Sequence, residues 1–298
     1  MKNKIIKILT LGFIMFLSAC NSKKSNSKEN NSSLKEVTYL GQKPPSIIPE
    51  VFALGNITTS NWEYGGAFSP DSKEFYYLRE IIDAEGKKKQ EFVVFKNENN
   101  KWTKIVISSR KGQPFVSPDG KILHLGSKYM EQTEKGWSTL KKLKYPFKDL
   151  PIMRLTVSAK GTYFFDEFKR DFTGDIRYSR LINGKHEEPR KLNKEINTGK
   201  SFHPFIAADE SYLIFDSTRE GGFGDSDIYI SFRQKDNSWG NPINLGEKIN
   251  TEAWEASASV TPDGKYLFFN RINGAKKDGN VDIFWVDSKV IEKLRPKK

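Results

Sequence analysis

The stretch Val260-Thr-Pro-Asp-Gly-Lys-Tyr-Leu-Phe-Phe-Asn270 decides how the rest of the chain is interpreted. An apolar residue leads into a Pro-Asp-Gly turn, in which proline fixes φ, aspartate can bond its own backbone and glycine accepts a positive φ. The aromatic run from Tyr266 to Phe269 suits a pleated, half-buried strand. The stretch therefore predicts two antiparallel strands joined by a tight turn.

The same pattern recurs along the chain. Two copies, which begin at Phe68 and Val116, keep Ser-Pro-Asp, and two degraded copies begin at Val157 and Ile206. The fourth residue of each copy serves as a marker, and successive markers are 48, 41, 49 and 54 residues apart: Asp71, Asp119, Lys160, Asp209 and Asp263. A period of roughly 40 to 50 residues with several strands per unit is typical of a β-propeller.

Each unit continues with two further strands. The third is exemplified by Asp227-Ile-Tyr-Ile-Ser231, and a polar turn then leads through a tryptophan to a fourth strand, as in Trp239-Gly-Asn-Pro-Ile-Asn-Leu-Gly246. The sequence thus predicts an all-β propeller of four-stranded blades. The repeat count gives five blades, and a sixth would require a copy that has drifted beyond recognition. The last unit stops at its third strand, so we expect the N-terminal segment Pro49-Glu-Val-Phe-Ala-Leu-Gly55 to complete it and close the ring.

The N-terminus predicts export. Residues 1–19 have the basic and apolar regions of a signal peptide, and Leu-Ser-Ala-Cys20 contains the only cysteine of the chain. Residues 20–37 are rich in Ser, Asn and Lys and predict a flexible tether. Residues 38–298 form the single predicted propeller domain.

These motifs resemble known families. Leu-Ser-Ala-Cys20 is similar to the lipobox of bacterial lipoproteins, which implies lipidation of Cys20 and attachment to a membrane. Asn21 after it implies an outer-membrane lipoprotein, and we expect it to face the periplasm. The Pro-Asp-Gly-Lys turns and Asp-Ile-Tyr strands resemble the WD40-like Pro-Asp repeats of TolB-like propellers over roughly residues 40–290. The degraded turn Ala159-Lys160 departs from that pattern.

One ring of positions is the candidate ligand site. Six residues before each marker stand Gly65, Gln113, Arg154, His203 and Ser257. In a propeller the strand that leads into this turn is typically innermost, so these side chains should line the central channel. With Glu63 and Glu255 two residues earlier, the candidate ligand-binding residues at the channel mouth are Glu63, Gln113, Arg154, His203 and Glu255. Alternatively, these residues bond one another and hold channel water.

Several function classes find no support in the sequence. The histidines His124, His186 and His203 are far apart and lack metal-ligand spacing, so we expect no metal site and no cofactor. No Gly-x-Ser-x-Gly motif is present, so no catalytic nucleophile is assigned. The net charge is +12, or +9 without the three signal-peptide lysines, but the lysines scatter through turns and export argues against nucleic acid.

The function that follows is a lipid-anchored binding or scaffold module of the bacterial cell envelope, without catalysis, whose partner is another envelope protein or an acidic glycan. The alternative is a lyase-like carbohydrate-active enzyme, in which Arg154 holds a substrate carboxylate and His203 is the base. A purely structural envelope protein is a third class, which predicts no ligand.

Overall fold

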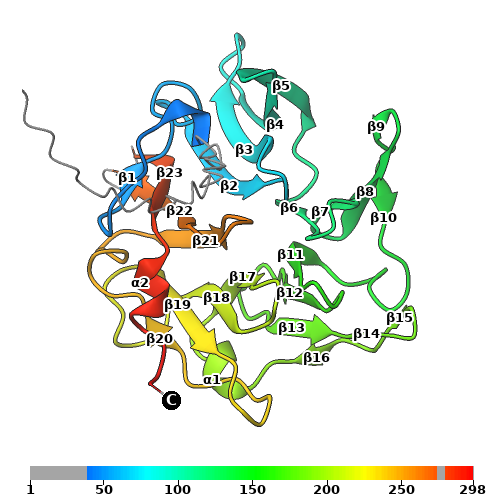
Figure 1. The fold of residues 1–298 in the computed structure, drawn as a ribbon, viewed down its shortest axis with the longest axis vertical. Coiled ribbons are helices and arrows are strands. Elements are labelled where there is room, and N and C mark those ends of the chain that lie inside the picture. The colour runs from blue at the N-terminus through cyan, green and yellow to red at the C-terminus, as the bar shows by residue number, and fades with distance from the viewer. Residues whose placement is uncertain (1–38, 274–278, 298) are drawn as a thin grey trace, which may run out of the picture. The chain divides into compact units, whose positions relative to one another are not determined.

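The computed structural model describes residues 39–273 and 279–297, and in this part of the chain five antiparallel sheets surround a central axis (Figure 1). The predicted signal peptide, Cys20 and tether lie outside the described residues. Each sheet is built on a path of four strands that runs outward from the axis. The fold is therefore an all-β, five-bladed propeller, as the repeat count predicts.

Blades one and two come first along the chain. Blade one consists of β2 (Trp62–Phe68), β3 (Glu74–Ile82), β4 (Lys88–Glu98) and β5 (Lys101–Ser109). Blade two consists of β6 (Pro114–Val116), β7 (Ile122–Leu125), β8 (Lys128–Thr133) and β10 (Lys141–Lys142), with β9 (Gly136–Trp137) paired to β8.

Blades three and four repeat the plan. Blade three consists of β11 (Ile152–Val157), β12 (Tyr163–Glu167), β13 (Ile176–Ser179) and β16 (Arg190–Lys191), with a separate hairpin of β14 (Leu181–Ile182) and β15 (Lys185–His186). After the short helix α1 (Lys194–Asn197), blade four consists of β17 (Ser201–Ile206), β18 (Tyr212–Ser217), β19 (Asp227–Phe232) and β20 (Ile243–Asn244). The repeat analysis does not predict α1, which Asn193 caps by accepting a bond from the Ile196 amide.

Blade five joins the two ends of the described chain. It consists of β21 (Glu255–Val260), β22 (Tyr266–Asn273), β23 (Asn280–Asp287) and the N-terminal β1 (Glu50–Val51). Glu50 pairs with Trp285 and Val51 with Phe284, so the predicted closure by an N-terminal strand is confirmed. The 3₁₀-helix η1 (Tyr39–Gly41) precedes it, and α2 (Lys289–Glu292) follows β23.

The Pro-Asp turn forms the same hydrogen-bond network in three blades. In blade five, Thr261 Oγ1 donates to Asp263 Oδ1 at 2.7 Å, and the same oxygen accepts from the Lys265 amide at 3.1 Å. Ser69 with Asp71 and Ser117 with Asp119 repeat these bonds. The hydroxyl in turn accepts from the amide that begins the second strand. The recurring Ser/Thr-Pro-Asp sequence therefore fixes the register of these hairpins.

The first strands of neighbouring blades contact one another around the axis: β2, β6, β11, β17 and β21.

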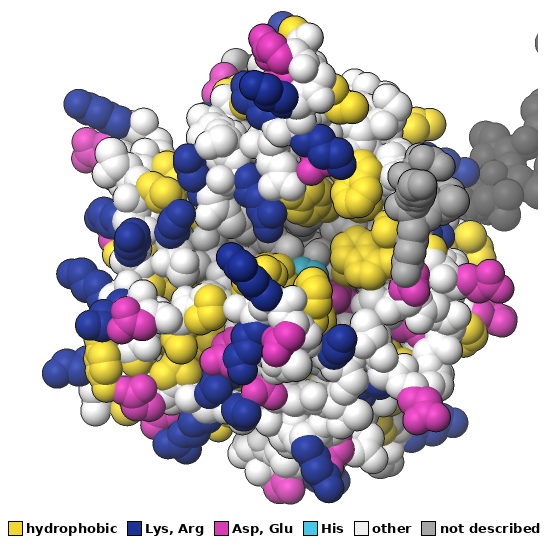
Figure 2. Space-filling model, turned by 180° about the vertical axis from the view of Figure 1, so that it is seen from behind, with side chains coloured by type: hydrophobic (Ala, Val, Ile, Leu, Met, Phe, Trp, Pro, Cys, Tyr) yellow, Lys and Arg dark blue, Asp and Glu magenta, His cyan; other side chains and the backbone are white. Residues whose placement is uncertain are grey.

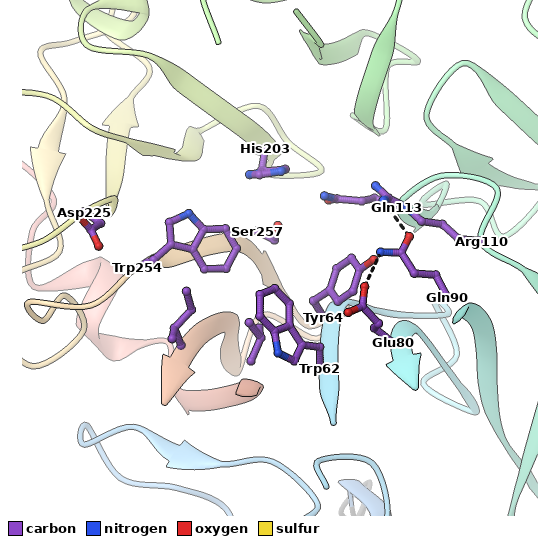
Figure 3. Close-up of a pocket in the computed structure, with 12 residues that line it drawn as sticks. Trp62, Tyr64, Glu80, Gln90, Arg110, Gln113, His203, Asp225, Trp254 and Ser257 are labelled. Atoms are coloured by element: carbon purple, nitrogen blue, oxygen red, sulfur yellow. Dashed lines mark hydrogen bonds between the residues drawn. The ribbon is translucent and has the colours of Figure 1, made fainter. Parts of the chain in front are cut away.

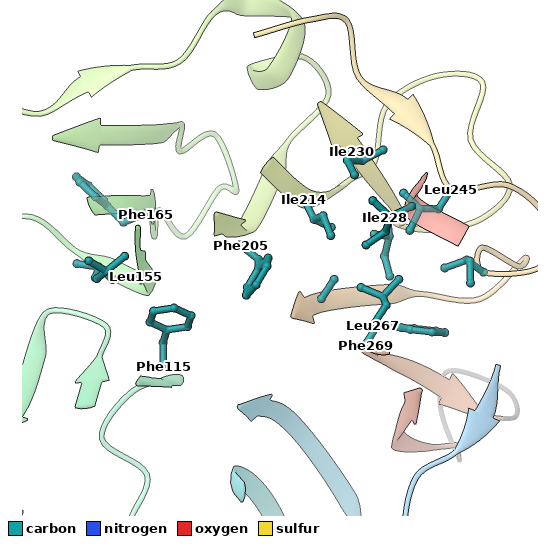
Figure 4. Packing of buried hydrophobic residues seen from close by; sticks show 14 of the residues in the cluster. Phe115, Leu155, Phe165, Phe205, Ile214, Ile228, Ile230, Leu245, Leu267 and Phe269 are labelled. Carbon is teal, nitrogen blue, oxygen red and sulfur yellow. The ribbon is translucent and has the colours of Figure 1, made fainter. Parts of the chain in front are cut away.

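The hydrophobic core lies between blades. Its largest cluster joins blades two to five, with Phe115, Leu155, Phe205 and Leu267 among its members (Figure 4). A second cluster packs Phe52, just after β1, against Phe68, Phe268 and Trp285. Among the described residues, no helix is long and apolar enough to cross a membrane.

Candidate functional site

A cavity of about 480 Å³ opens at the end of the channel where the inner strands begin. On this face of the molecule, a histidine is visible in a central hollow beside hydrophobic side chains (Figure 2). Residues from blades one, two, four and five line the cavity, among them Trp62, Tyr64, Gln113, His203, Trp254 and Ser257 (Figure 3).

Two indole rings form one wall of the cavity. Trp62 and Trp254 both line the cavity, and His203 lies across it from Trp62 (Figure 3). The Trp62 side chain is oriented by a hydrogen bond of 3.0 Å from its Nε1 to the carbonyl oxygen of Gly279. Trp62 remains 37% exposed, so its ring is available to a ligand. This wall provides flat apolar surface next to polar groups.

His203, which lines the cavity, forms a buried pair with Asp216. Nδ1 of His203 lies 2.9 Å and 3.0 Å from the two carboxylate oxygens of Asp216. Burial alone would lower the pKa of His203, but the charge and hydrogen bond of Asp216 raise it above its ordinary value. Because Nδ1 is held by Asp216, Nε2 is the ring nitrogen left for a ligand or a proton transfer.

Arg154 and Asp166 extend this pair into a buried group of four charges. The amide of Arg154 donates to Asp166 Oδ1 at 2.8 Å, and the amide of His203 donates to Asp166 Oδ2 at 2.9 Å. The Arg154 guanidinium crosses the channel to the carbonyl oxygen of Ala258, 2.9 Å away. Burial lowers the pKa of Arg154 to about 10 and raises the pKa of Asp166. Hydrogen bonds therefore join His203 to both carboxylates, and Arg154 to Asp166, in one buried network.

The backbone at the predicted ring positions is distorted in a regular way. Gly65, His203 and Ser257 all have positive φ, of 69°, 48° and 55°, and each lies where the pairing register of its strand shifts. The amide of each donates to a side chain on the second strand of the preceding blade: Asn270, Asp166 and Asp216 respectively. These bulges turn inner-strand residues toward the channel and join neighbouring blades.

The five predicted site residues occupy two environments. Gln113 and His203 line the cavity together. Glu63 and Glu255 are fully buried and lie outside the lining, each bound by the amide and hydroxyl of a threonine four residues earlier, Thr59 and Thr251. Arg154, 1% exposed, also lies outside the lining. The structure thus brings two of the five into the cavity and places the others behind it.

The tryptophans of the wall lie outside the ring of positions that the repeats predicted. Both stand nine residues before their markers, Trp62 in blade one and Trp254 in blade five. The same position is occupied in the other blades by Arg110, Pro151 and Lys200. A comparison of this position across the repeats could have found the wall. It would also have revealed that the aromatic residues belong to adjacent blades and the cations to others.

Arg110 contributes a positive charge at the blade-two side of the cavity. Its guanidinium lies 5.8 Å from the centre of the Tyr64 ring, and its Nη1 donates to Gln90 Oε1 at 3.1 Å. Gln90 in turn donates to Glu80, which also forms a 2.8 Å ion pair with Lys88. The bond from Lys88 lowers the pKa of Glu80, so this lining carboxylate stays ionised.

The structure places the remaining histidines away from this cavity. His124 is on β7, is 1% exposed and packs edge-on against Tyr163, as expected for a packed residue. His186 on β15 packs against the same tyrosine, with the ring centres 3.9 Å apart and the planes tilted by 41°. In residues 39–273 and 279–297, no three His, Cys, Asp or Glu side chains come together as a metal-binding group.

Comparison with known proteins adds little beyond the fold. No family model and no curated protein matches the chain, so the resemblance to Pro-Asp-repeat lipoproteins stays a prediction. Solved structures with a similar arrangement include the catalytic domain of a GH62 α-L-arabinofuranosidase from Coprinopsis cinerea, at 8% identity and a TM-score of 0.49. The match covers 82% of this chain and 97% of that one.

Two further solved structures show how varied these neighbours are. An α-L-arabinofuranosidase from Lactobacillus brevis is 9% identical, with a TM-score of 0.46 and coverage of 77% of this chain and 91% of that one. The β-propeller domain of the Trilobed protease from Pyrococcus furiosus is 15% identical, with a TM-score of 0.34 and coverage of 78% and 70%. Likenesses this distant carry no activity over to this chain.

Proposed function

We propose that this propeller is a binding module for an acidic glycan, which enters the channel mouth and packs a sugar ring against Trp62 and Trp254. The observation that carries the proposal is the cavity itself, with an aromatic wall on one side and the His203–Asp216 pair on the other. Ligand sites of this kind combine apolar surface with a few oriented polar groups.

The charges at the cavity favour a ligand with a carboxylate. Arg110 supplies a fixed positive charge, and His203 supplies a second one when it is protonated. Of the two acidic residues in the lining, Glu80 is already paired with Lys88, and Asp225 lies in blade four, away from Arg110 (Figure 3). A sugar carboxylate near Arg110 and His203 Nε2 would form charge-assisted hydrogen bonds, which are stronger than neutral ones.

The arrangement of the carboxylates favours binding of the glycan without its hydrolysis. Glycoside hydrolysis needs two carboxyl groups that face the scissile bond, one of them with a raised pKa so that it can donate a proton. Two carboxylates, Glu80 and Asp225, are among the described residues that line the cavity, and the pKa of Glu80 is lowered by its bond from Lys88. Asp166 and Asp216 are buried, and they accept bonds from Arg154, His203 and Ser257.

The test is calorimetric titration of the mature domain with an oligogalacturonate and with a neutral oligosaccharide of equal length. We expect the acidic sugar to bind and to quench tryptophan fluorescence. Trp62→Ala/Trp254→Ala should abolish this binding, while Trp102→Ala on β5, outside the cavity, should leave it unchanged. Failure of the oligogalacturonate to bind, equal binding of the neutral oligosaccharide, or full binding by the double variant would refute the proposal.

A second candidate function rests on the orientation of His203. Asp216 fixes its Nδ1, so Nε2 could remove a proton from a carbon next to a sugar carboxylate, which is the step that begins a lyase reaction. Formation of an unsaturated product, followed by ultraviolet absorbance, would establish this activity. Its loss in Asp216→Asn with binding retained would identify His203 as the base.

We also propose that the protein is attached to the outer membrane through lipid on Cys20 and acts in the periplasm. The sequence Leu-Ser-Ala-Cys20 supports this location. Metabolic labelling with a radioactive fatty acid should label the full chain but not a Cys20→Ser variant. Equal labelling of both chains would overturn the assignment.

A further inference from the structure

Blade one has an outer strand unlike those of the other blades. β5 contains 9 residues, whereas the outermost strands of blades two to five, β10, β16, β20 and β1, contain 2 residues each. Its neighbours β3 and β4 are long as well, with 9 and 11 residues. Blade one therefore ends at the rim of the propeller in an extended strand edge (Figure 1), here called the β5 edge and defined as Lys101–Ser109.

The β5 edge exposes apolar side chains. Ile105, Val106 and Ile107 are consecutive and 45%, 46% and 37% exposed. Successive residues of a strand point to opposite faces, so apolar surface is exposed on both sides of the sheet at its rim. Three adjacent β-branched residues also have a high preference for the extended conformation. A partner strand would cover side chains that are now in water.

The backbone of the β5 edge is free to pair on its outer side. On the inner side it pairs with β4 from Glu98↔Lys101 to Glu91↔Ser109. Half of the N–H and C=O groups of an outermost strand point away from its neighbour. In the part of the chain that the structure describes, no backbone–backbone bond beyond this ladder involves residues 101–109, and the Ser109 carbonyl accepts a bond from the Ser108 hydroxyl.

The positive charges around the β5 edge favour an acidic partner over a second copy of the same strand. Lys101, Lys104 and Lys111 are positive, and no Asp or Glu occurs between residues 101 and 118. A second copy of β5 would bring the same lysines together, and like charges across two strands are destabilising. In addition, Ile107 has no counterpart on β4, a bulge of the kind that discourages self-pairing.

We propose that the β5 edge binds an extended acidic segment of another polypeptide, which adds to blade one as a fifth, antiparallel strand. Apolar side chains of that segment cover the exposed apolar residues of the β5 edge on the face to which they point, and its acidic residues pair with Lys101 and Lys104. Main-chain hydrogen bonds supply affinity, and the charges supply selectivity. This surface is separate from the glycan cavity and does not depend on it.

The experiment uses two fluorescent nine-residue peptides, one with alternating valine and glutamate and one with lysine in place of glutamate. Fluorescence anisotropy with the mature protein should give at least about tenfold tighter binding of the acidic peptide, equivalent to ~1.4 kcal/mol. Lys101→Glu/Lys104→Glu should reverse this preference. Lys142→Glu/Lys144→Glu, an equal charge change beside the short outer strand β10, should preserve it.

Amide hydrogen exchange on the unmodified protein provides an independent measurement. The acidic peptide should slow exchange of outward-facing amides in residues 101–109 and leave the cavity residues unchanged. Unchanged exchange there, equal binding of the acidic peptide by the Lys101/Lys104 variant, or a dimer in sedimentation that Ile105→Lys dissolves would each overturn the proposal.

Discussion

At the scale of single residues, the hydroxyl group in the turn between the first two strands finds different hydrogen-bond partners in different blades. In blade three, Ala159-Lys160 replaces Pro-Asp, and the turn is one residue shorter, since Val157 pairs with Tyr163 whereas Val260 pairs with Leu267. The hydroxyl of Ser158 has no aspartate in its own turn and donates instead to Glu210 of blade four, at 2.8 Å. A contact between blades thus replaces the missing local one.

Because Glu210 takes the place of the missing aspartate, we expect its substitution to lower the stability of the protein. Glu210 also forms a 3.0 Å ion pair with Arg233, and it is 8% exposed. We expect Glu210→Ala to lower the free energy of unfolding by about 1–3 kcal/mol, because it leaves buried donors unpaired. Urea denaturation measures this, with the exposed Glu252→Ala as the control. Equal stabilities of the two variants would contradict the role of Glu210.

The buried pair in the channel makes a prediction about ionisation. Asp216→Asn keeps an oxygen for the Ser257 amide, as Asn270 does for Gly65 in the neighbouring blade, but it removes the negative charge beside His203. The pKa of His203 should therefore be above 6.5 in the natural protein and fall in Asp216→Asn. Nuclear magnetic resonance titration of the imidazole nitrogens measures both values.

Comparison of two Asp216 variants separates the charge from the hydrogen bonds. Asp216→Ala leaves the Ser257 amide and His203 without their acceptor, so it should be less stable than Asp216→Asn by about 1–3 kcal/mol. An unchanged His203 pKa in Asp216→Asn would show that the carboxylate does not control its protonation.

At the scale of elements, ring closure depends on a very short strand. β1 has two residues and so few ladder bonds, yet Phe52, which follows it, is completely buried. Its ring contacts Phe68 and Phe75 of blade one and Phe268 and Trp285 of blade five. Packing between the first and last blades, more than strand pairing, therefore closes the propeller.

We expect Phe52→Ala to lower the free energy of unfolding by about 3–5 kcal/mol, because it removes a large buried side chain and leaves a cavity. The control is Leu54→Ala, two residues along the chain, where the side chain is 74% exposed and the change should have little effect. Chemical denaturation compares them. A small effect at Phe52 would mean that β1 pairing, and not this packing, closes the ring.

At the scale of the whole molecule, the histidines give opposite pH dependences. Burial lowers the pKa of His124 to about 3, so the unfolded chain binds a proton that the folded chain excludes as pH falls from 6.5 toward 3. His203 has a raised pKa, and its stabilising contribution is complete below 6.5 and is lost as pH rises through that raised value. Stability should therefore decline on both sides of near-neutral pH.

On the acid side, the decline between pH 6.5 and 5.5 should approach about 1.4 kcal/mol per pH unit from His124. His186, whose pKa is also lowered by burial, adds to the same slope. His124→Phe should flatten the profile in this range, as measured by urea denaturation at each pH. An unaltered slope in that variant would show that other groups control acid stability.

The sequence by itself determined the repeat, the five blades and the closing strand, because these depend on local turn chemistry and on the period of apolar runs. It also indicated the inner-strand ring on which Gln113 and His203 face the cavity. Only the tertiary structure decided which neighbours reach the cavity: Trp62 and Trp254 line it, while Glu63 and Glu255, one residue later, are buried against their own loops. Successive side chains of a strand point in opposite directions, so a shift of one residue exchanges the two roles.

Arg154 lies on the predicted ring, but its long side chain extends across the channel to the carbonyl oxygen of Ala258. The two residues are 104 positions apart in the sequence, so no local pattern encodes this contact, and only the tertiary structure decided it.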